Sequence, residues 1–491
     1  AGTHSGCLRR YFPAMRFITS GTSGAAALVA LLACNPIDPP PATTPAIDSR
    51  AVALLDTIQQ RTFAYFWERT DPATGLTPDR WPTQSFSSIA AVGFALTAYP
   101  VGVERGYVSR ADAATRTLTT LRWFWQAKQD SAGTDVSGYH GLFYHFLNPQ
   151  DGTRFKTVEL STIDTALLLA GVLFSQQYFD QSNPDEAAIR AYADSLYRRV
   201  DWQWAVRPSH RMGGGWSPEE GFPQWEWSGY DEGMILYLLA LGSPTHPAPP
   251  ESWTAWTASY QWGTFYGQTH LGFPPLFGHQ YTQLWVDFRG IQDPYMRGHG
   301  IDYFENSRRA TNSQRAYATA NPMGWVGYDS VVWGLTATDG PADVTLPVDR
   351  TPRRFYTYAA RGASFIEPPR DDGTLAPTAV GGSVAFAPEI SINGLYAMRQ
   401  RYGDDLFGRY GFVDAFNPTW TWSTPAPSQG KVVPGKGWFD TDYLGIDQGP
   451  ILLMIENYRS GLIWKYMRKS PYIVQGLRRA GFTGGWLDQA R

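Results

Sequence analysis

The sequence predicts an all-α protein of paired helices, an (α/α)6 toroid with six inner and six outer helices and short β-hairpins in its loops. Three observations favour this fold. Apolar residues recur at helical spacing in about a dozen segments. Strands do not alternate with helices, as an α/β fold requires. No fixed-period repeat indicates an open helical solenoid. The 49 glycines and 36 prolines predict long connections between the helices.

Each predicted helix follows from an apolar run of helical length. We expect helices over residues 50–69, 87–99, 109–128, 161–179, 184–204, 228–241, 250–262, 307–320, 353–363, 388–401, 403–411 and 446–468. The strand-like pieces 284–288 and 383–386 are expected to form hairpins in the loops.

Two of these helices begin with a capping signal. Ser161 with Asp164, and Ser228 with Asp231, fit a capping box, in which a hydroxyl caps the helix and an acid three residues later reaches back to it. Gly242 marks the end of the helix that Ser228 is expected to start.

Composition excludes some functions and leaves others open. Lys+Arg 41 against Asp+Glu 44 gives a net charge of -3, so no basic surface for nucleic acid is expected. Aromatic residues make up 15% of the chain. Flat rings stack on the apolar faces of sugars, but large cores also consume aromatics. Composition alone does not separate the two uses.

The N-terminal region predicts export. A basic start at Met15–Arg16, a short apolar run and the sequence Leu31–Cys34 resemble a bacterial lipoprotein signal, with Cys34 as the lipidated residue. An ordinary signal peptide is the alternative. We therefore expect three parts: residues 1–34 as extension and signal, 35–48 as a Pro-rich tether, and 49–491 as one catalytic domain. The predicted location is the periplasm or the outer membrane of a Gram-negative bacterium.

The cysteine count narrows the chemistry of the predicted domain. Cys7 and Cys34 are the only cysteines, so residues 49–491 hold no cysteine nucleophile and no thiolate metal site. We expect no metal and no cofactor.

Acids at predicted helix starts are the candidates for catalysis. Hydrolysis of a glycosidic bond needs one carboxyl to protonate the leaving oxygen and a second carboxylate to activate water or attack. Glu159 lies just before a predicted helix, and Asp164 lies in its first turn, where capping is the alternative role. Glu232 follows Asp231 in an aromatic setting, which would raise its pKa toward that of a general acid.

Further polar and aromatic residues around these acids are expected to bind substrate. Two pairs in this set, Asp287 with Arg289 and Glu305 with Arg308, could instead be structural ion pairs. The full expected set is Tyr144, His145, Trp227, Tyr230, Asp231, His279, Gln280, Tyr281, Trp285, Asp287, Arg289, Glu305, Asn306, Arg308, Trp333, Asp339, Glu389, Tyr443 and Asp447.

At these segments the sequence resembles the glucoamylase-like family, and within it glycoside hydrolase family 144, the bacterial β-1,2-glucanases. The strings GYDEGMILYLLALGSPTHP (229–247) and DYFENSRRAT (302–311) carry the resemblance, with 141–145, 159–169, 275–290 and 333–341. It implies an (α/α)6 fold and metal-free, carboxylate-based hydrolysis of β-1,2-glucan. It also implies Glu232 as general acid, with Glu159 or Asp164 as base or water-positioning acid. Asp231 stands where many relatives are expected to have Asn.

The expected reaction is single-displacement hydrolysis with inversion, giving sophorose or short oligosaccharides. Internal and terminal cleavage both stay open. The alternatives are hydrolysis or transglycosylation of another glucan by the same fold, or a lipid-anchored glycan-binding protein that releases no product. We expect a monomer whose partner is the glucan, with membrane contact only through an anchor at Cys34.

Overall fold

Helices dominate the structure, a computed structural model that describes residues 47–490. These residues fall within one compact unit. The helices are α1 (Ser49–Arg69), α2 (Ile89–Glu104), α3 (Arg110–Gln126), α4 (Thr162–Tyr178), α5 (Pro184–Arg199), α6 (Met234–Gly242), α7 (Glu251–Thr257), α8 (Phe277–Trp285), α9 (Pro294–His299), α10 (Tyr303–Ala320), α11 (Pro377–Gly381), α12 (Pro388–Tyr402), α13 (Gly445–Ser460), α14 (Leu462–Met467) and α15 (Pro471–Arg479).

The helices divide into two kinds by the pattern of their side chains. All nine residues of α6 are buried, and α2, α4 and α13 are buried along nearly their whole length. A helix that is apolar on every side must lie inside the protein. By contrast, α3 and α5 bury one face and expose the other. The first kind forms the interior layer and the second covers it.

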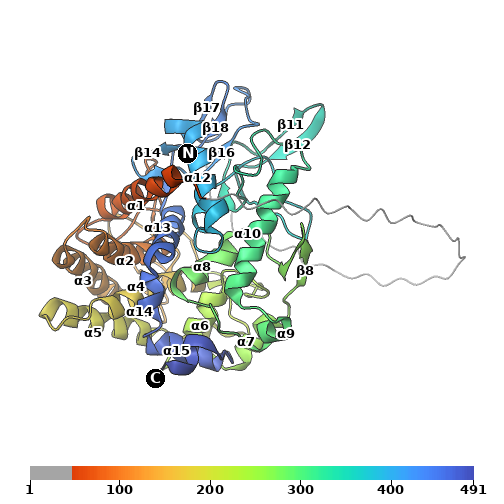
Figure 1. Cartoon of the computed structure of the whole chain (residues 1–491). Coiled ribbons are helices and arrows are strands. Elements are labelled where there is room, and N and C mark those ends of the chain that lie inside the picture. The colour runs from red at the N-terminus through yellow and green to blue at the C-terminus, as the bar shows by residue number, and fades with distance from the viewer. Residues whose placement is uncertain (1–46, 491) are drawn as a thin grey trace, which may run out of the picture. The chain divides into compact units, whose positions relative to one another are not determined.

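Contacts between the interior helices run in a closed circuit. Helix α2 contacts α4, α4 contacts α6, α6 contacts α8, α8 contacts α13, and α13 returns to α2. Figure 1 shows α1, α3 and α5 lying outside α2 and α4. Two glycines allow the closest of these approaches. A Cβ on Gly93 would lie 2.3 Å from the Leu167 carbonyl oxygen, and one on Gly171 would lie 2.1 Å from that of Gly93.

The strands are short, antiparallel and confined to the connections between helices, as the sequence predicts. The largest sheet among residues 47–490 has four strands, in the order β3-β4-β6-β7. The strands pair as β1 (Arg80–Trp81) with β19 (Tyr443–Leu444), β2 (Ser87–Ser88) with β5 (Phe146–Leu147), β3 (Gly138–Tyr139) with β4 (Leu142–Tyr144), β4 with β6 (Leu160–Ser161), β6 with β7 (Gly215–Trp216), β8 (Trp262–Phe265) with β9 (Gln268–Leu271), β10 (Ala337–Asp339) with β13 (Tyr358–Ala360), β11 (Val344–Val348) with β12 (Thr351–Phe355), β14 (Phe407–Gly408) with β15 (Gly411–Phe412), and β18 (Gly437–Phe439) with both β16 (Phe416–Asn417) and β17 (Lys431–Val433).

Several expected elements are wrong. Residues 353–363 and 403–411 were expected to be helical, but they form strands β12 to β15 and a short 3-10 turn. The expected strands at 284–288 and 383–386 are the end of α8 and a series of turns. Helix α6 begins at Met234 and not at the expected Ser228 cap. The short helices α8, α9, α11 and α15 were not predicted, because each is shorter than the roughly 10–12 residues over which a helical pattern of apolar residues can be recognised.

The expected lipoprotein signal and most of the tether lie outside residues 47–490. Among the described residues, no helix has the length and apolar character needed to cross a bilayer.

Candidate active site

Glu159 and Asp164 flank the start of α4, where strand β6 delivers them beside β4. The hydroxyl of Ser161 accepts the Asp164 amide N–H at 3.1 Å and donates to Asp164 Oδ2 at 2.5 Å. This capping box was predicted from the sequence, and the structure confirms it. His145 follows β4. Its Nδ1 lies 2.8 Å from Glu159 Oε1, and its Nε2 lies 3.4 Å from Asp164 Oδ2.

His145 therefore bridges the two acids, and the charges of all three are interdependent. Burial disfavours a charged imidazole, but the carboxylates of Asp164 and Glu159 outweigh it and raise the His145 pKa to about 9. Burial likewise opposes ionisation of Glu159, yet the imidazolium holds its pKa below the usual value. For Asp164 burial prevails, and its pKa is raised. At neutral pH His145 is a cation shared between the two carboxyls.

Glu232 lies in the turn that leads into α6. The expected pairing of Ser228 with Asp231 does not form, because Asp231 Oδ1 instead accepts the Gly233 amide N–H at 2.9 Å. This local bond fixes the turn. Because Asp231 makes it, the Glu232 carboxyl is not needed there and can act as an acid. Burial, together with the negative charge of Asp164, raises the Glu232 pKa from 4.5 to about 7. A carboxyl of that pKa can donate a proton near neutrality.

Tyr281, on α8, ties these acids to the start of α13. Its hydroxyl donates to the Ile446 carbonyl oxygen at 3.4 Å. Burial raises the Tyr281 pKa well above its usual value, and the negative charges of Asp447, Glu232 and Asp164 raise it further. Four interior helices therefore contribute to one site, with the acids gathered at the starts of α4, α6 and α13.

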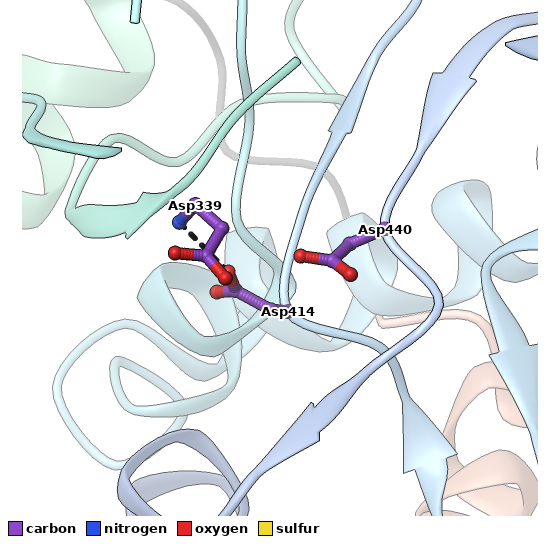
Figure 2. Close-up of side chains that lie close together, drawn as sticks. All are labelled: Asp339, Asp414 and Asp440. Atoms are coloured by element: carbon purple, nitrogen blue, oxygen red, sulfur yellow. Dashed lines mark hydrogen bonds between the residues drawn. The ribbon is translucent and has the colours of Figure 1, made fainter. Parts of the chain in front are cut away.

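A second group of carboxylates lies next to Asp447, and the sequence predicted only part of it. Asp339, Asp414 and Asp440 converge so that one oxygen from each lies within 4.8 Å of the others (Figure 2). The Asp339 amide N–H donates to Asp414 Oδ2 at 2.8 Å. Burial, and then the charge of Asp339, raises the Asp414 pKa to about 6.

Among the described residues, Arg80 is the basic side chain that forms ion pairs with this second group. Arg80 lies 2.7 Å from Asp339, 3.1 Å from Asp79 and 3.9 Å from Asp442. Sequence reasoning missed Asp79, Arg80, Asp414, Asp440 and Asp442. They come from separate loops, and no spacing within any one segment signals their convergence.

Five residues expected to bind substrate lie in the packed interior and do not support that role. Burial lowers the His279 pKa to about 3, and its Nε2 is 3.0 Å from the Phe273 carbonyl oxygen. Gln280 donates to the Ala379 carbonyl oxygen at 2.8 Å. The others are Trp285, which donates to Thr97, Asn306, which accepts the Leu271 amide, and the fully buried Trp333.

Two pairs that were expected to bind substrate form structural ion pairs, which was the alternative prediction. Asp287 lies past the C-terminal end of α8, where it binds Arg289 and also Arg468. Glu305 binds Arg308 at 2.6 Å and Arg309 at 2.8 Å. Carboxylates whose oxygens already bind guanidinium groups have little capacity left to accept hydrogen bonds from a sugar.

The remaining expected residues differ in their position. Trp227 donates from Nε1 to Thr162 Oγ1 at 3.1 Å, so it lies over the start of α4. Tyr230 is buried and stacks on Tyr303. The others are Tyr144, buried in β4, Glu389, in the first turn of α12, and Tyr443, in β19.

Comparison with protein families agrees with this arrangement. The family model named Glycoamylase, described as "Putative glucoamylase", matches residues 224–471, which include Glu232, Tyr281 and the second carboxylate group of Asp339, Asp414 and Asp440. The chain belongs to the glucoamylase-like family. This confirms the family resemblance predicted from the sequence.

Relatives of this glucoamylase-like chain carry more specific descriptions. An exo β-1,2-glucooligosaccharide sophorohydrolase (non-reducing end) of Parabacteroides distasonis is 30% identical over an alignment of 463 residues, and the match covers 87% of this chain and 57% of the relative. The chain thus spans little more than half the length of that relative.

Two solved structures are also similar to this chain. A structure from Bacteroides uniformis, described as a "putative glucoamylase", is 33% identical with a TM-score of 0.75, covering 89% of this chain and 98% of that one. The endo-β-1,2-glucanase of Chitinophaga pinensis, solved with sophorotriose and glucose, is 28% identical with a TM-score of 0.73, covering 89% and 99%.

Proposed function

We propose that this chain is a glycoside hydrolase that cleaves β-1,2-glucan to sophorose or short β-1,2-gluco-oligosaccharides. The observation that carries the proposal is Glu232, a carboxyl with a pKa of about 7, at a site where His145 holds the pKa of Glu159 below its usual value. The relatives named for β-1,2-glucan and sophorose supply the substrate class. The closed circuit of interior helices supports an (α/α)6 toroid as its scaffold.

In the proposed reaction Glu232 protonates the leaving glycosidic oxygen. A carboxylate on the opposite face of the sugar accepts a proton from water, and that water attacks the anomeric carbon, inverting it. Glu159 suits the base role better than Asp164. Its pKa is lowered, so it is ionised at neutral pH, and its side chain is 28% exposed against 7% for Asp164. Asp164 instead supports the raised Glu232 pKa and anchors His145.

The first test is incubation with linear β-1,2-glucan, following product sizes over time. Release of sophorose or short oligosaccharides supports the proposal. A random ladder of products indicates internal cleavage, whereas accumulation of one disaccharide indicates cleavage from an end. No product from β-1,2-glucan, with turnover of another β- or α-glucan in a substrate panel, would reject the proposed linkage.

Stereochemistry is tested separately by proton NMR of the first-formed anomer. An α-anomer is expected for inversion, and a product that keeps the β configuration would reject single displacement. Saturable glycan binding with no product would favour the alternative of a binding protein. Acids at three helix starts argue against that alternative.

We also propose export and lipidation at Cys34, with the enzyme acting as a monomer. The sequence at Leu31–Cys34 supports this part. Metabolic labelling with a radioactive fatty acid should mark the wild-type protein and not the Cys34→Ala variant. Light scattering should give the mass of one chain.

A further inference from the structure

We propose that Asp339, Asp414 and Asp440 form a binding site for a calcium ion that joins three loops of the C-terminal half. The three residues come from β10, from the segment between β15 and β16, and from the end of β18. Calcium binding at these three residues can be measured separately from the proposed hydrolase activity.

The separation of the three carboxylates matches the size of calcium. One oxygen from each of the three residues lies within 4.8 Å of the others. Calcium binds oxygen ligands at about 2.4 Å, so two ligands on opposite sides of one ion are about 4.8 Å apart. Magnesium demands a near-ideal octahedron at about 2.1 Å, whereas calcium accepts irregular sets of oxygen ligands such as carboxylates from three separate segments. In Figure 2 the carboxyls of Asp339 and Asp414 lie next to each other, and that of Asp440 is directed toward them.

Asp440 supplies the second, independent observation. Its side chain is buried, with 2% of the residue exposed. Oδ1 accepts the amide N–H groups of Thr441 and Asp442, which fix the carboxyl in place. Oδ2 has no hydrogen-bond partner among the described residues. A buried carboxylate oxygen without a partner is costly, and a cation is the ligand that such an oxygen binds best.

The scarcity of ion pairs around the three aspartates also favours a bound cation. Arg80 pairs with Asp339 and is shared with two further carboxylates. Within residues 47–490, no ion pair links Asp414 or Asp440 to a basic side chain. Asp447 lies against this group, where its carboxyl shares a hydrogen bond with that of Asp414, so one of the two carries a proton when no cation is bound. Its Oδ2 is likewise buried without a partner in the described chain, which makes Asp447 a candidate fourth ligand.

A bound ion would hold the loops around the start of α13. Asp414 lies two residues before β16, and Asp440 directly follows β18, which pairs with β16. The buried pair of Arg361 with Asp372 already fixes β10 from the other side, because Arg361 donates to the Thr338 carbonyl oxygen at 2.6 Å. Calcium would therefore connect β10 to this sheet where no backbone ladder joins them.

The test measures calcium directly on the full chain. Protein stripped with a chelating resin is dialysed against calcium or magnesium, and bound metal is measured by mass spectrometry of the elements. We expect one calcium per chain, little magnesium, and a melting temperature that rises saturably with calcium, since a ligand that binds only the native state stabilises it. Wild-type protein that retains no calcium and shows no such rise would overturn the proposal.

Two variants separate this site from general effects on stability. Asp440→Asn keeps an oxygen for the amides of Thr441 and Asp442 but places an NH2 group where Oδ2 was, so calcium affinity should fall about tenfold or more. Asp371→Asn is the matched control. Asp371 is a partly buried acid that accepts the hydroxyls of Tyr317 and Tyr328 outside the cluster. It should bind calcium like wild type even if it melts lower. Equal calcium affinity in Asp440→Asn and wild type would reject Asp440 as a ligand.

Discussion

Replacing Glu232 with Gln removes the proposed proton donor while keeping the shape of the side chain. An ordinary glutamate, with a pKa of 4.5, would be protonated in about 0.3% of molecules at pH 7. A pKa of about 7 makes that fraction about half, a gain of roughly 150-fold. A positioned general acid contributes about 10²- to 10⁴-fold. The variant should therefore lose about 3–5 kcal/mol of transition-state stabilisation.

The assay is kcat/KM on linear β-1,2-glucan between pH 4 and pH 9. In wild type it should fall above pH 7, about tenfold per pH unit, as Glu232 loses its proton. Glu232→Gln should abolish this limb and retain substrate binding. An aryl glycoside whose leaving group needs no protonation should recover most of the loss.

Glu226→Gln is the matched control, because Glu226 lies in the same loop and binds the Ser209 hydroxyl at 2.6 Å. It should leave turnover near that of wild type. Glu232 is not the general acid if Glu232→Gln keeps more than about a tenth of wild-type kcat, or if its alkaline limb is unchanged.

Three further predictions concern the surroundings of Glu232. Asp231→Asn should keep kcat within about threefold, because an amide oxygen can still accept the Gly233 N–H; a collapse of activity would assign Asp231 a chemical role. The raised His145 pKa should stabilise the fold by about 3 kcal/mol below pH 6.5, and this stabilisation should disappear as pH rises through about 9. Denaturant unfolding of wild type and His145→Ala at pH 6 and pH 10 measures it, and an equal difference at both pH values would contradict it. Gly93→Ala should cost about 3 kcal/mol or more, because its Cβ would lie 2.3 Å from a backbone oxygen of α4, whereas Gly298→Ala meets nothing within 4 Å and should be nearly neutral. Similar unfolding midpoints for these two variants would refute the tight contact between α2 and α4.

The sequence predicts those structural features that depend only on residues close together in the chain. The long helices and the Ser161–Asp164 cap follow from local spacing, which the structure confirms. Glu232 could be singled out because Asp231 had a local use, although that use is the Gly233 amide and not the expected cap. Helix α8 was missed because tertiary packing buries eight of its nine residues, polar ones included.

The second carboxylate group was beyond prediction for a different reason. Its members lie on loops up to about a hundred residues apart, counting from Asp339 to Asp440, and only the folded chain brings them together. The same difference between local spacing and long-range contacts explains why the sequence alone did not place His279 and Gln280 in the interior. Gln280 and His279 are polar residues with no local explanation, and their partners are backbone carbonyls on distant or irregular segments.

The first turn of α4 gives Asp164 two roles, one in the helix cap and one in the electrostatics of the site. Asp164 closes the helix start with Ser161, and its negative charge helps keep the proton on Glu232. Fraying of that single turn on heating would move Asp164 away and let the Glu232 pKa fall. The enzyme should then lose activity at neutral pH several degrees before it unfolds, and regain it on cooling. Engineering for heat tolerance should therefore begin at this turn, even though most of the buried surface lies elsewhere.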